Sequence, residues 1–573
     1  MILSSQLEGF LEWAKSNGSY IDATIEFKST PTAGISAFAK EQLHDTSREL
    51  ISVPKKLLIT KETAEDLLGK TICVTTNPNA LTQLLIAKLK FSDEQSLKAD
   101  ERYNFYLPYI NMLPSIKDLH TPFFWPCSEL EALKGTDLYI KTTRMLLTLI
   151  KEWQDVRTAF GVTEETIYHR LYQAGDVIAL LKHLNEQINK SGELKWDDFP
   201  AYLWAASIFT SRAFPRIVMP GGNDINEAFL YPVVDLLNHS NGKKVKWSYD
   251  ATRETVSFAI SEKVKAGDEI FNNYGDRSNE HLLLHYGFAI SNNEFDVATM
   301  SLRLPKESLA KAKALGVKFD EASLIDDTVN FEIPASGELP ANLVELFSSL
   351  HMLSSEKFMT VRSTLHGLDQ LHSLLQQKAK VFKQAIPAAL KTAHIVKSYK
   401  TYCSSQRRIF ATACETTIRQ QKSILKKCKP LSFKTVMNND KLFSNSILLA
   451  LGVPSYEEMI HKGLTQQVLL LWIVRMGNMK AYPTLEVPNG SFVHDMFQEV
   501  KSTIAVDQAD VLEYLDFYKG LFPGLQSKCP EVYGVGDWSI KQFIIAGTVI
   551  DRLEWTKSSS KEPYLIERLP IFE

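Results

Sequence analysis

The chain has 573 residues, a formal net charge of −3, 23% charged residues and 45% hydrophobic residues. This length predicts roughly two to four domains, and the composition excludes an intrinsically disordered chain. The richest apolar stretch, residues 468–476, is interrupted by Arg475 and falls short of the roughly 20 residues that a membrane span needs. The N-terminus lacks the basic start and the apolar stretch of a signal peptide.

The cysteines argue against a metal centre and against a secreted protein. Six cysteines are spread along the chain, and no two have the C-x-x-C spacing typical of a structural zinc site. Their spacing indicates no disulfide framework, so we expect a reducing compartment. We therefore predict a protein with no metal and no membrane partner, located in the cytoplasm, with the nucleus as the alternative.

The first part of the chain alternates between helical and β-like patterns. Residues 5–16 predict an amphipathic helix, because apolar side chains recur at spacings of three and four. Residues 21–59 contain short β-like runs broken by glycine and proline. From about residue 60 to residue 204 the pattern is mainly helical. Within it, the aromatic- and proline-rich stretch 106–126 predicts an ordered loop.

β-like segments return in the middle of the chain, and beyond Leu302 the pattern is helical almost to the end. The segments are 229–234, 245–249, 255–260 and 269–272. The predicted fold class is therefore α+β: a β-rich domain split by a helical insertion, followed by an all-helical C-terminal lobe. The expected parts are 1–74 (first part of the β-rich domain with the N-terminal helix), 75–204 (insertion), 205–295 (second part) and 300–573 (lobe).

Three short segments carry residues suited to ligand binding. The sequence PTAGI at residues 31–35 is a small-residue turn before a β-like run, which lets a ligand approach backbone groups closely. The sequence DLLNHS at residues 235–240 ends in side chains that both donate and accept hydrogen bonds. The sequence GDEIFNNYG at residues 267–275 places Tyr274 beside a glycine after a predicted strand. Each segment alone is also typical of an ordinary turn.

In this order the three segments resemble the SET domain of protein methyltransferases, in which a small-residue turn, N-H-S and G-[DE]-E-[IL]-x-x-x-Y-G follow one another. The resemblance narrows to the branch of Rubisco large-subunit methyltransferase, the actin-histidine methyltransferases and the fungal methyltransferases of ribosomal-protein and elongation-factor lysines. Further marks of this branch are residues 210–214, 277–280 and 286–288, and residues 113–114, 121–125 and 133–136 in the insertion. Beyond about residue 300 only the helical character agrees.

The resemblance implies a protein-lysine N-methyltransferase that uses S-adenosyl-L-methionine (AdoMet) as methyl donor. The implied AdoMet site consists of Thr32, Ala33, Gly34, Arg212, Asn238 and His239. A guanidinium group such as that of Arg212 can bind the AdoMet carboxylate through two hydrogen bonds. The sequence departs from the family at the turn, which usually reads Glu-Gly-x-Gly and here reads Pro-Thr-Ala-Gly. The geometry of this turn is therefore left open.

The resemblance makes Tyr274 the catalytic residue. Its hydroxyl would orient the amine or the methyl group, and an apolar channel would lower the lysine pKa from its free value of about 10.4. Arg216 and Asp235 match positions that contact substrate in the plant enzyme. Tyr286 matches a second tyrosine that lysine-modifying members have and the actin-histidine enzyme lacks, so it favours lysine over histidine as the target.

The lobe contains a strongly basic segment. Residues 378–429 hold thirteen Lys or Arg and one acidic residue, Glu415. Such a run is either a solvated helix face or a surface for RNA or an acidic protein. The expected substrate is a ribosomal protein or an elongation factor, which would bring this segment near the ribosome. Two alternatives stay open: a protein-histidine methyltransferase, and a non-catalytic binding module that keeps the SET scaffold.

Overall fold

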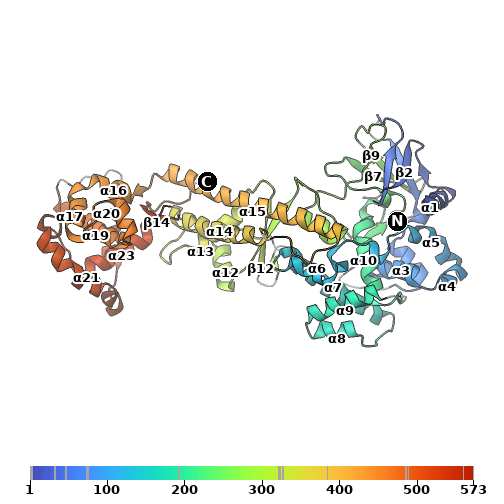
Figure 1. Cartoon of the computed structure of the whole chain (residues 1–573), viewed down its shortest axis with the longest axis horizontal. Helices are drawn as coiled ribbons and strands as arrows, with labels where there is room; N and C mark the ends of the chain where they lie inside the picture. The colour runs from blue at the N-terminus through green and yellow to red at the C-terminus, as the bar shows by residue number, and fades with distance from the viewer. Residues whose placement is uncertain are drawn as a thin grey trace. The chain divides into compact units, whose positions relative to one another are not determined.

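The computed structural model divides the chain into two compact units (Figure 1). The first consists of residues 1–297 and 381–406, and the second of residues 298–380 and 407–573. The residues that the structure describes are 4–30, 34–44, 48–71, 77–190, 194–222, 224–320, 324–325, 328–383, 385–483, 485, 487, 490–558 and 560–571. The finer boundaries expected from the sequence remain predictions.

Two antiparallel sheets in the first unit join segments from both sides of the helical insertion. One sheet has the order β1 (Tyr20–Ile21), β4 (Glu49–Pro54), β8 (Thr255–Ile260), β7 (Val245–Asp250). A second has the order β2 (Ile25–Thr30), β3 (Gly34–Ala39), β9 (Glu269–Ile270), and a third pairs β5 (Ala213–Pro215) with β6 (Ala228–Leu230). Ile51 lies opposite Phe258, and Ala37 lies opposite Ile270. The two halves of the β-rich domain are therefore one structure, as predicted.

Several helices of the first unit contribute to one apolar core. Helix α10 (Phe199–Arg212) is buried along its length from Phe199 to Phe209, which explains why it is apolar on all sides. It contacts α3 (Ala80–Phe91), most of whose residues are also buried. The other helices are α1 (Ser4–Ser16), α2 (Lys61–Leu68), α4 (Glu94–Ala99), α5 (Glu101–Met112), α6 (Cys127–Leu130), α7 (Asp137–Ala159), α8 (Ile167–Gln173), α9 (Val177–Asn189) and α11 (Asn279–Tyr286).

The prediction of a loop at residues 106–126 is wrong for the first part of this stretch. Helix α5 runs through Pro108 to Met112, and short 3-10 turns follow at Ile116–Asp118 and Pro122–Phe124. A proline inside a helix costs about 3 kcal/mol. Burial of Tyr109 and Ile110, both fully inaccessible, offsets that cost at about 2 kcal/mol or more per large apolar side chain.

The β-like run expected at residues 229–234 is also shorter in the structure. Strand β6 ends at Leu230, and Val234–Leu236 form a 3-10 turn. Pro232 has no backbone N–H to continue a ladder. Val233 adopts a φ of 73°, which a strand does not allow. The chain thus leaves the sheet and enters a tight turn just before the Asn238–His239 motif.

The second unit is mainly helical, as predicted, and it also contains short strands that the sequence did not predict. They form two three-stranded sheets, β10 (Val297–Arg303)–β12 (Thr328–Pro334)–β11 (Leu324–Ile325) and β13 (Leu431–Ser432)–β15 (Glu562–Leu565)–β14 (Glu554–Lys557). In β12, Val329, Phe331 and Ile333 are buried and alternate with more exposed residues, which is the period of a strand. This alternation is a signal that the sequence offered and that the helical assignment missed.

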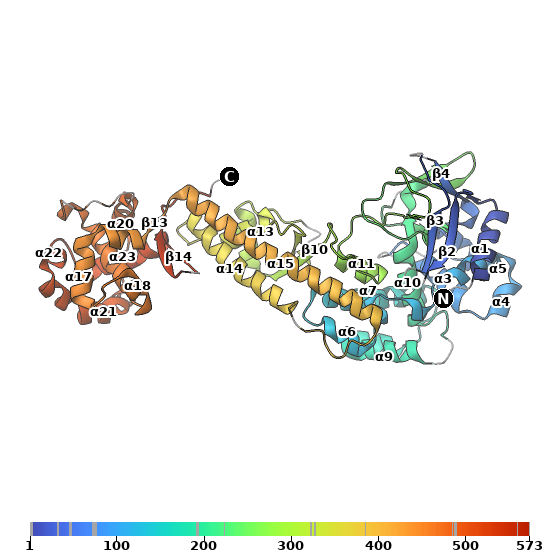
Figure 2. The same ribbon diagram turned by 45° about the horizontal axis from the view of Figure 1, so that its top comes forward.

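Helix α14 (Val361–Val381) is followed by the 36-residue α15 (Ala393–Cys428), which contributes residues to both units. Within the second unit they lie side by side (Figure 2), and Gln421 Nε2 donates to Asp369 Oδ1 at 2.9 Å. The remaining helices are α12 (Lys306–Ala314), α13 (Ala341–Leu350), α16 (Phe433–Asn439), α17 (Lys441–Leu451), α18 (Tyr456–His461), α19 (Thr465–Gly477), α20 (Ser491–Thr503), α21 (Gln508–Lys528), α22 (Pro530–Tyr533) and α23 (Ile540–Leu553). Among the helices that the structure describes, none is long and apolar enough to cross a bilayer.

Candidate active site

The Asn238–His239 motif and the Tyr274 motif lie side by side. A parallel bridge pairs His239 with Asn272. The backbone N–H of Asn272 donates to Asn238 O at 2.8 Å, and that of Ser240 donates to Asn272 O at 3.2 Å. Two segments more than thirty residues apart in the sequence therefore run together, and this brings Tyr274 next to the turn that follows β6.

Tyr274 is held by its backbone, its hydroxyl and its ring. Its backbone N–H donates to His239 Nδ1 at 3.0 Å, and its hydroxyl donates to Leu237 O at 2.8 Å. Its ring stacks on His239, with centroids 5.0 Å apart, and on Tyr286, with centroids 4.9 Å apart and planes 15° apart. The structure thus brings together the predicted residues Tyr274, His239 and Tyr286 in one aromatic stack.

The aromatic stack carries no charge near neutral pH. Burial raises the pKa of the Tyr274 and Tyr286 phenols, so both keep their protons. Burial also lowers the pKa of His239, and the neutral ring accepts the Tyr274 N–H at Nδ1. An amine placed against such a surface would be shifted towards its neutral, nucleophilic form, since desolvation disfavours its charged form.

Asn238 ties the turn to two strands. Its side-chain Nδ2 donates to Glu269 Oε1 at 2.7 Å, to Ser36 Oγ at 2.9 Å and to Ile35 O at 3.3 Å. Gly34, at the start of β3, has a φ of 71°, a conformation that favours glycine. The other predicted residues of this turn, Thr32 and Ala33, lie outside the residues that the structure describes.

Arg212 and Asp235 form a partly buried pair with a tyrosine from the insertion. Arg212, at the end of α10, donates from Nη1 to Asp235 O at 2.9 Å and to Asp235 Oδ2 at 3.4 Å. The Tyr109 hydroxyl donates to the same Oδ2 at 2.9 Å. The Arg212 side chain is 26% exposed, whereas that of Asp235 is fully buried. Tyr109 was not predicted from the sequence, because its partner lies 126 residues further along the chain.

One carboxylate oxygen of Asp235 accepts no hydrogen bond from the described residues. Its Oδ1 atom is buried and has no hydrogen-bond partner within the described ranges. A buried carboxylate oxygen is expected to be satisfied, so this atom fits an N–H donor of a bound molecule. The partly exposed guanidinium of Arg212 beside it fits a carboxylate. The pair therefore suits a ligand that carries both an amino and a carboxyl group, as the methionine part of AdoMet does.

Arg216 takes a different place. It is buried in a 3-10 turn, where Nη2 pairs with Glu62 Oε1 at 3.0 Å and Nε approaches Glu227 Oε1 at 3.5 Å. Its Nη1 donates to Pro220 O at 3.0 Å. Between Arg216 and Tyr274 or Asp235, the described part of the chain shows no hydrogen bond or ion pair. A substrate-binding role for Arg216 stays a prediction.

Helix α11 places Tyr286 at its last residue. Ser278 caps its first turn by accepting from His281 N at 3.2 Å. The buried Glu280 pairs with Lys141 of α7 and accepts from the Tyr402 hydroxyl at 3.1 Å. Gly287 ends the helix with a φ of 81°. The motif at residues 277–280 and the glycine at 287 thus fix the direction and the end of the helix that carries Tyr286.

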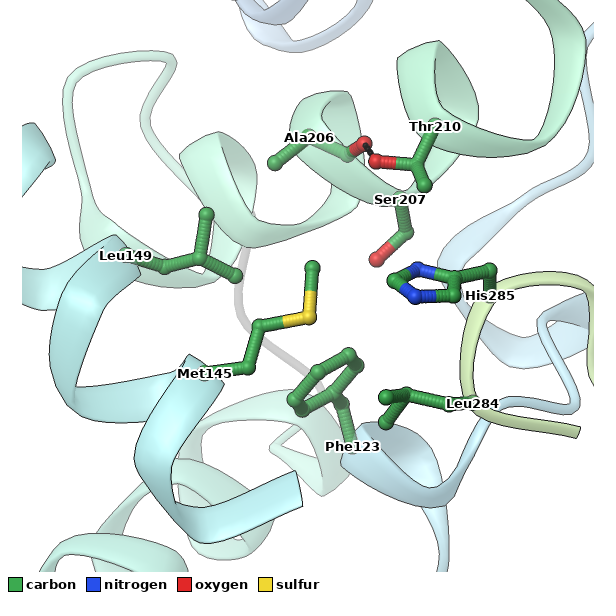
Figure 3. Close-up of a pocket in the computed structure, with 8 residues that line it drawn as sticks. All are labelled: Phe123, Met145, Leu149, Ala206, Ser207, Thr210, Leu284 and His285. Carbon is green, nitrogen blue, oxygen red and sulfur yellow. Dashed lines mark hydrogen bonds between the residues drawn. The ribbon is translucent and has the colours of Figure 1, made fainter. Parts of the chain in front are cut away.

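The same helix lines a small pocket through Leu284 and His285 (Figure 3). Figure 3 shows the His285 ring facing Ser207, with Met145 and Phe123 closing the apolar side. Burial lowers the pKa of His285 to about 4 and that of its neighbour His281 to about 3, so both rings are neutral at physiological pH. Among the described residues, no three His, Cys, Asp or Glu side chains gather as metal ligands.

Known proteins match most of the chain. Protein-lysine N-methyltransferase EFM1 of Saccharomyces cerevisiae is 38% identical over 591 residues, which cover 99% of this chain and 98% of that protein. Ribosomal lysine N-methyltransferase 1 of the same organism is 27% identical over 533 residues, covering 84% of this chain and 88% of that protein. The family model of the EFM1 middle domain matches residues 297–428.

The fold agrees with a solved methyltransferase. The structure of Rubisco LSMT bound to AdoMet aligns with a TM-score of 0.53 at 16% identity, covering 74% of this chain and 93% of that chain. The predicted α+β class with a helical C-terminal region is therefore confirmed, as is the predicted enzyme class, an AdoMet-dependent protein-lysine N-methyltransferase. The chain belongs to the EFM1 family of protein-lysine N-methyltransferases, in the SET-domain branch that its motifs predicted.

Proposed function

We propose that this chain methylates the ε-amine of a lysine in a protein of the translation apparatus, an elongation factor or a ribosomal protein, in the cytoplasm. The observation that supports methyl transfer is the position of Tyr274. Its hydroxyl donates to the Leu237 carbonyl, and its ring stacks on the neutral rings of His239 and Tyr286. The similarity to a ribosomal lysine methyltransferase supports the substrate class.

AdoMet supplies an electrophilic methyl group on a sulfonium. The lysine nitrogen lone pair forms the new N–C bond while the C–S bond breaks, and the sulfur leaves as a neutral thioether. The chain must therefore align the two groups and keep the amine unprotonated. Leu237 O and the Tyr274 hydroxyl offer oxygen atoms for weak C–H···O contacts with the methyl group. The neutral stack lowers the pKa of the incoming amine.

The residues of the Arg212–Asp235 pair would hold the donor. The guanidinium of Arg212 would bind a carboxylate, and Asp235 Oδ1 would accept from an ammonium group. Asn238 keeps β3 and β9 against this turn. His239 fixes the backbone of Tyr274. The cofactor roles of Thr32, Ala33 and Gly34 and the substrate roles of Arg216 and Tyr286 are also part of this proposal. Asp235, which was expected to contact the substrate, is proposed to hold the donor instead.

The experiment is a transfer of radiolabelled methyl groups from AdoMet to ribosomes and to an elongation-factor fraction, both from cells that lack this protein. We expect a labelled protein whose modified peptide contains methyl-lysine by mass spectrometry. Tyr274→Phe should lower the rate by about 100-fold or more, by analogy with loss of one donor that acts on the transition state. Tyr20→Phe is the control, because Tyr20 is an exposed tyrosine whose hydroxyl donates to Asp22.

The outcomes separate the candidate functions. Methyl-histidine in the labelled peptide would replace lysine by histidine as the target. AdoMet binding without label on any cellular protein would favour a binding module. Equal rates for Tyr274→Phe and wild type would remove Tyr274 from the mechanism.

We also propose that the basic face of α15 contacts RNA near the target. Within the second unit, exposed Arg419, Lys422 and Lys426 follow one another at intervals of three and four residues, so they share one face about 4.5–6 Å apart. Lys427 is also exposed, and Glu415 is the acid on the same helix. A regular line of cations suits a phosphate backbone.

The RNA contact is tested by the salt dependence of binding to ribosomal RNA. The triple variant Arg419→Ala, Lys422→Ala, Lys426→Ala should flatten the slope of log K against log salt by roughly one unit for each lost phosphate contact. An unchanged slope would contradict the proposal. Binding of the wild type to an acidic protein substrate, with no binding to RNA, would assign the face to protein instead.

A further inference from the structure

The helical insertion contributes a buried side chain to the turn at residues 233–237, called the catalytic turn below because its Leu237 carbonyl accepts from Tyr274. Tyr109 lies on α5, is fully inaccessible, and its hydroxyl donates to Asp235 Oδ2 at 2.9 Å. Asp235 in turn receives Arg212 Nη1 at its backbone oxygen and at the same Oδ2. Two donors from separate elements therefore converge on one buried carboxylate oxygen.

The turn that carries Asp235 is strained. Val233, a β-branched residue, has a φ of 73°, and such a conformation costs about 1–3 kcal/mol and persists only where its surroundings hold it. Two residues after Asp235, Leu237 presents its carbonyl to the Tyr274 hydroxyl at 2.8 Å. A movement of Asp235 would therefore displace both the Arg212 guanidinium and the Leu237 carbonyl that accepts from the Tyr274 hydroxyl.

We propose that Tyr109 is a positioning residue for methyl transfer, which orients the Asp235 carboxylate so that this carboxylate holds Arg212 and the Leu237 carbonyl in place. This inference rests on the proposed methyl-transfer reaction. It makes the insertion part of the catalytic machinery, since one of its helices supplies a hydrogen bond to the turn that carries Asp235 in the second part of the SET domain.

The electrostatics of Asp235 give the proposal a measurable consequence. Burial raises the pKa of this carboxyl, while Arg212 and the Tyr109 hydroxyl lower it. The titratable and charged groups that face it are Arg212, Tyr109 and the Tyr274 phenol. Removal of the Tyr109 hydroxyl raises the pKa of Asp235 further, so the carboxylate, and with it the hold on Arg212, is lost at a higher pH.

The test compares Tyr109→Phe with Tyr106→Phe. Tyr106 is a matched control, because it is a largely buried tyrosine of the same helix whose hydroxyl donates to Lys56 O at 3.2 Å, away from the catalytic turn. The measurements are kcat/KM for AdoMet and for the protein substrate as functions of pH, and AdoMet affinity by calorimetry. Tyr109→Phe should lower kcat/KM for AdoMet about tenfold below neutral pH, the factor expected for one hydrogen bond to a charged group.

The pH profile separates a positioning role from loss of stability. For Tyr109→Phe, the acidic side of the pH profile of kcat/KM, its acid limb, should move to higher pH. The loss of kcat/KM relative to wild type should become smaller as the pH rises. For Tyr106→Phe the limb should stay where the wild type has it. An acid limb of Tyr109→Phe that coincides with the wild-type limb, or a loss that is equal for both variants at every pH, would overturn the proposal.

A second variant covers the case in which Tyr109→Phe folds poorly. Asp235→Asn keeps the shape of the side chain and removes its titration, so the acid limb should disappear. Tyr109→Phe added to Asp235→Asn should then cause little further loss of AdoMet affinity, because both act through one carboxylate. Equal costs of Tyr109→Phe in both backgrounds would refute the coupling. Calorimetry measures AdoMet binding without any methyl transfer. If the wild-type protein methylates no translation protein, the proposed function is refuted, but the effect of Tyr109 on AdoMet binding can still be tested.

Discussion

Replacement of Gly287 by alanine tests how the end of α11 places Tyr286. Gly287 has a φ of 81°, and a Cβ built on it would lie 2.7 Å from the backbone carbonyl carbon of His120 and 2.9 Å from Thr121 N. The positive φ costs an alanine about 1–2 kcal/mol. The contact is with backbone and cannot be relieved by a side-chain rotation, so overpacking adds about 1–3 kcal/mol.

The matched control is Gly69→Ala. Gly69 also ends a helix in the left-handed conformation, with a φ of 64°, but a Cβ there would meet nothing within 4 Å. Gly69→Ala should therefore cost about 1–2 kcal/mol of unfolding free energy. Gly287→Ala should cost about 2–5 kcal/mol, because its Cβ adds the contact with the backbone.

The assay is urea denaturation of both variants together with their methylation rates. We expect Gly287→Ala to lower kcat as well as stability, since a shift of the helix end moves Tyr286 away from its stack with Tyr274 at 4.9 Å. Gly69→Ala should keep the wild-type kcat at a temperature where it is folded. Equal destabilisation by the two variants would refute the argument from the His120 contact.

The remaining predictions concern the stack, a histidine pair and a buried ion pair. Tyr286→Leu should lower kcat about three- to tenfold with a smaller effect on stability, because ring stacking contributes about 0.5–1.5 kcal/mol; an unchanged steady-state rate would contradict the role of the stack. The partly buried His285 and His281 have pKa values lowered to about 4 and about 3. The stability they confer is therefore complete above the unfolded pKa of about 6.5 and is lost as pH falls towards the folded values. The unfolding free energy should drop between pH 6.5 and 4, and His285→Leu should flatten that drop in urea titrations. Arg475→Ala leaves Asp440 charged and buried, with both side chains at most 4% exposed and 2.8 Å apart, so denaturation should show a loss of about 3–5 kcal/mol; a loss below 1 kcal/mol would mean that water reaches the pair.

The sequence by itself determined the features that depend on neighbours along the chain. The helix at residues 4–16 and the strand at residues 255–260 follow from the spacing of their apolar residues. The motifs around Asn238 and Tyr274 were also visible, because each is a short run of unusual residue types. Their order along the chain was enough to predict the family, since motif order depends on the sequence alone.

Only the tertiary structure decided the features that depend on distant partners. Pro108 lies inside a helix because burial of its neighbours outweighs a local preference. Arg216 pairs with Glu62, 154 residues away, rather than with the residues of the aromatic stack. Tyr109, which lies inside the insertion, donates to Asp235, 126 residues further along the chain. A hydrogen bond between distant segments leaves no periodic trace in the sequence, because its geometry is set by how whole elements pack and not by the residues beside it.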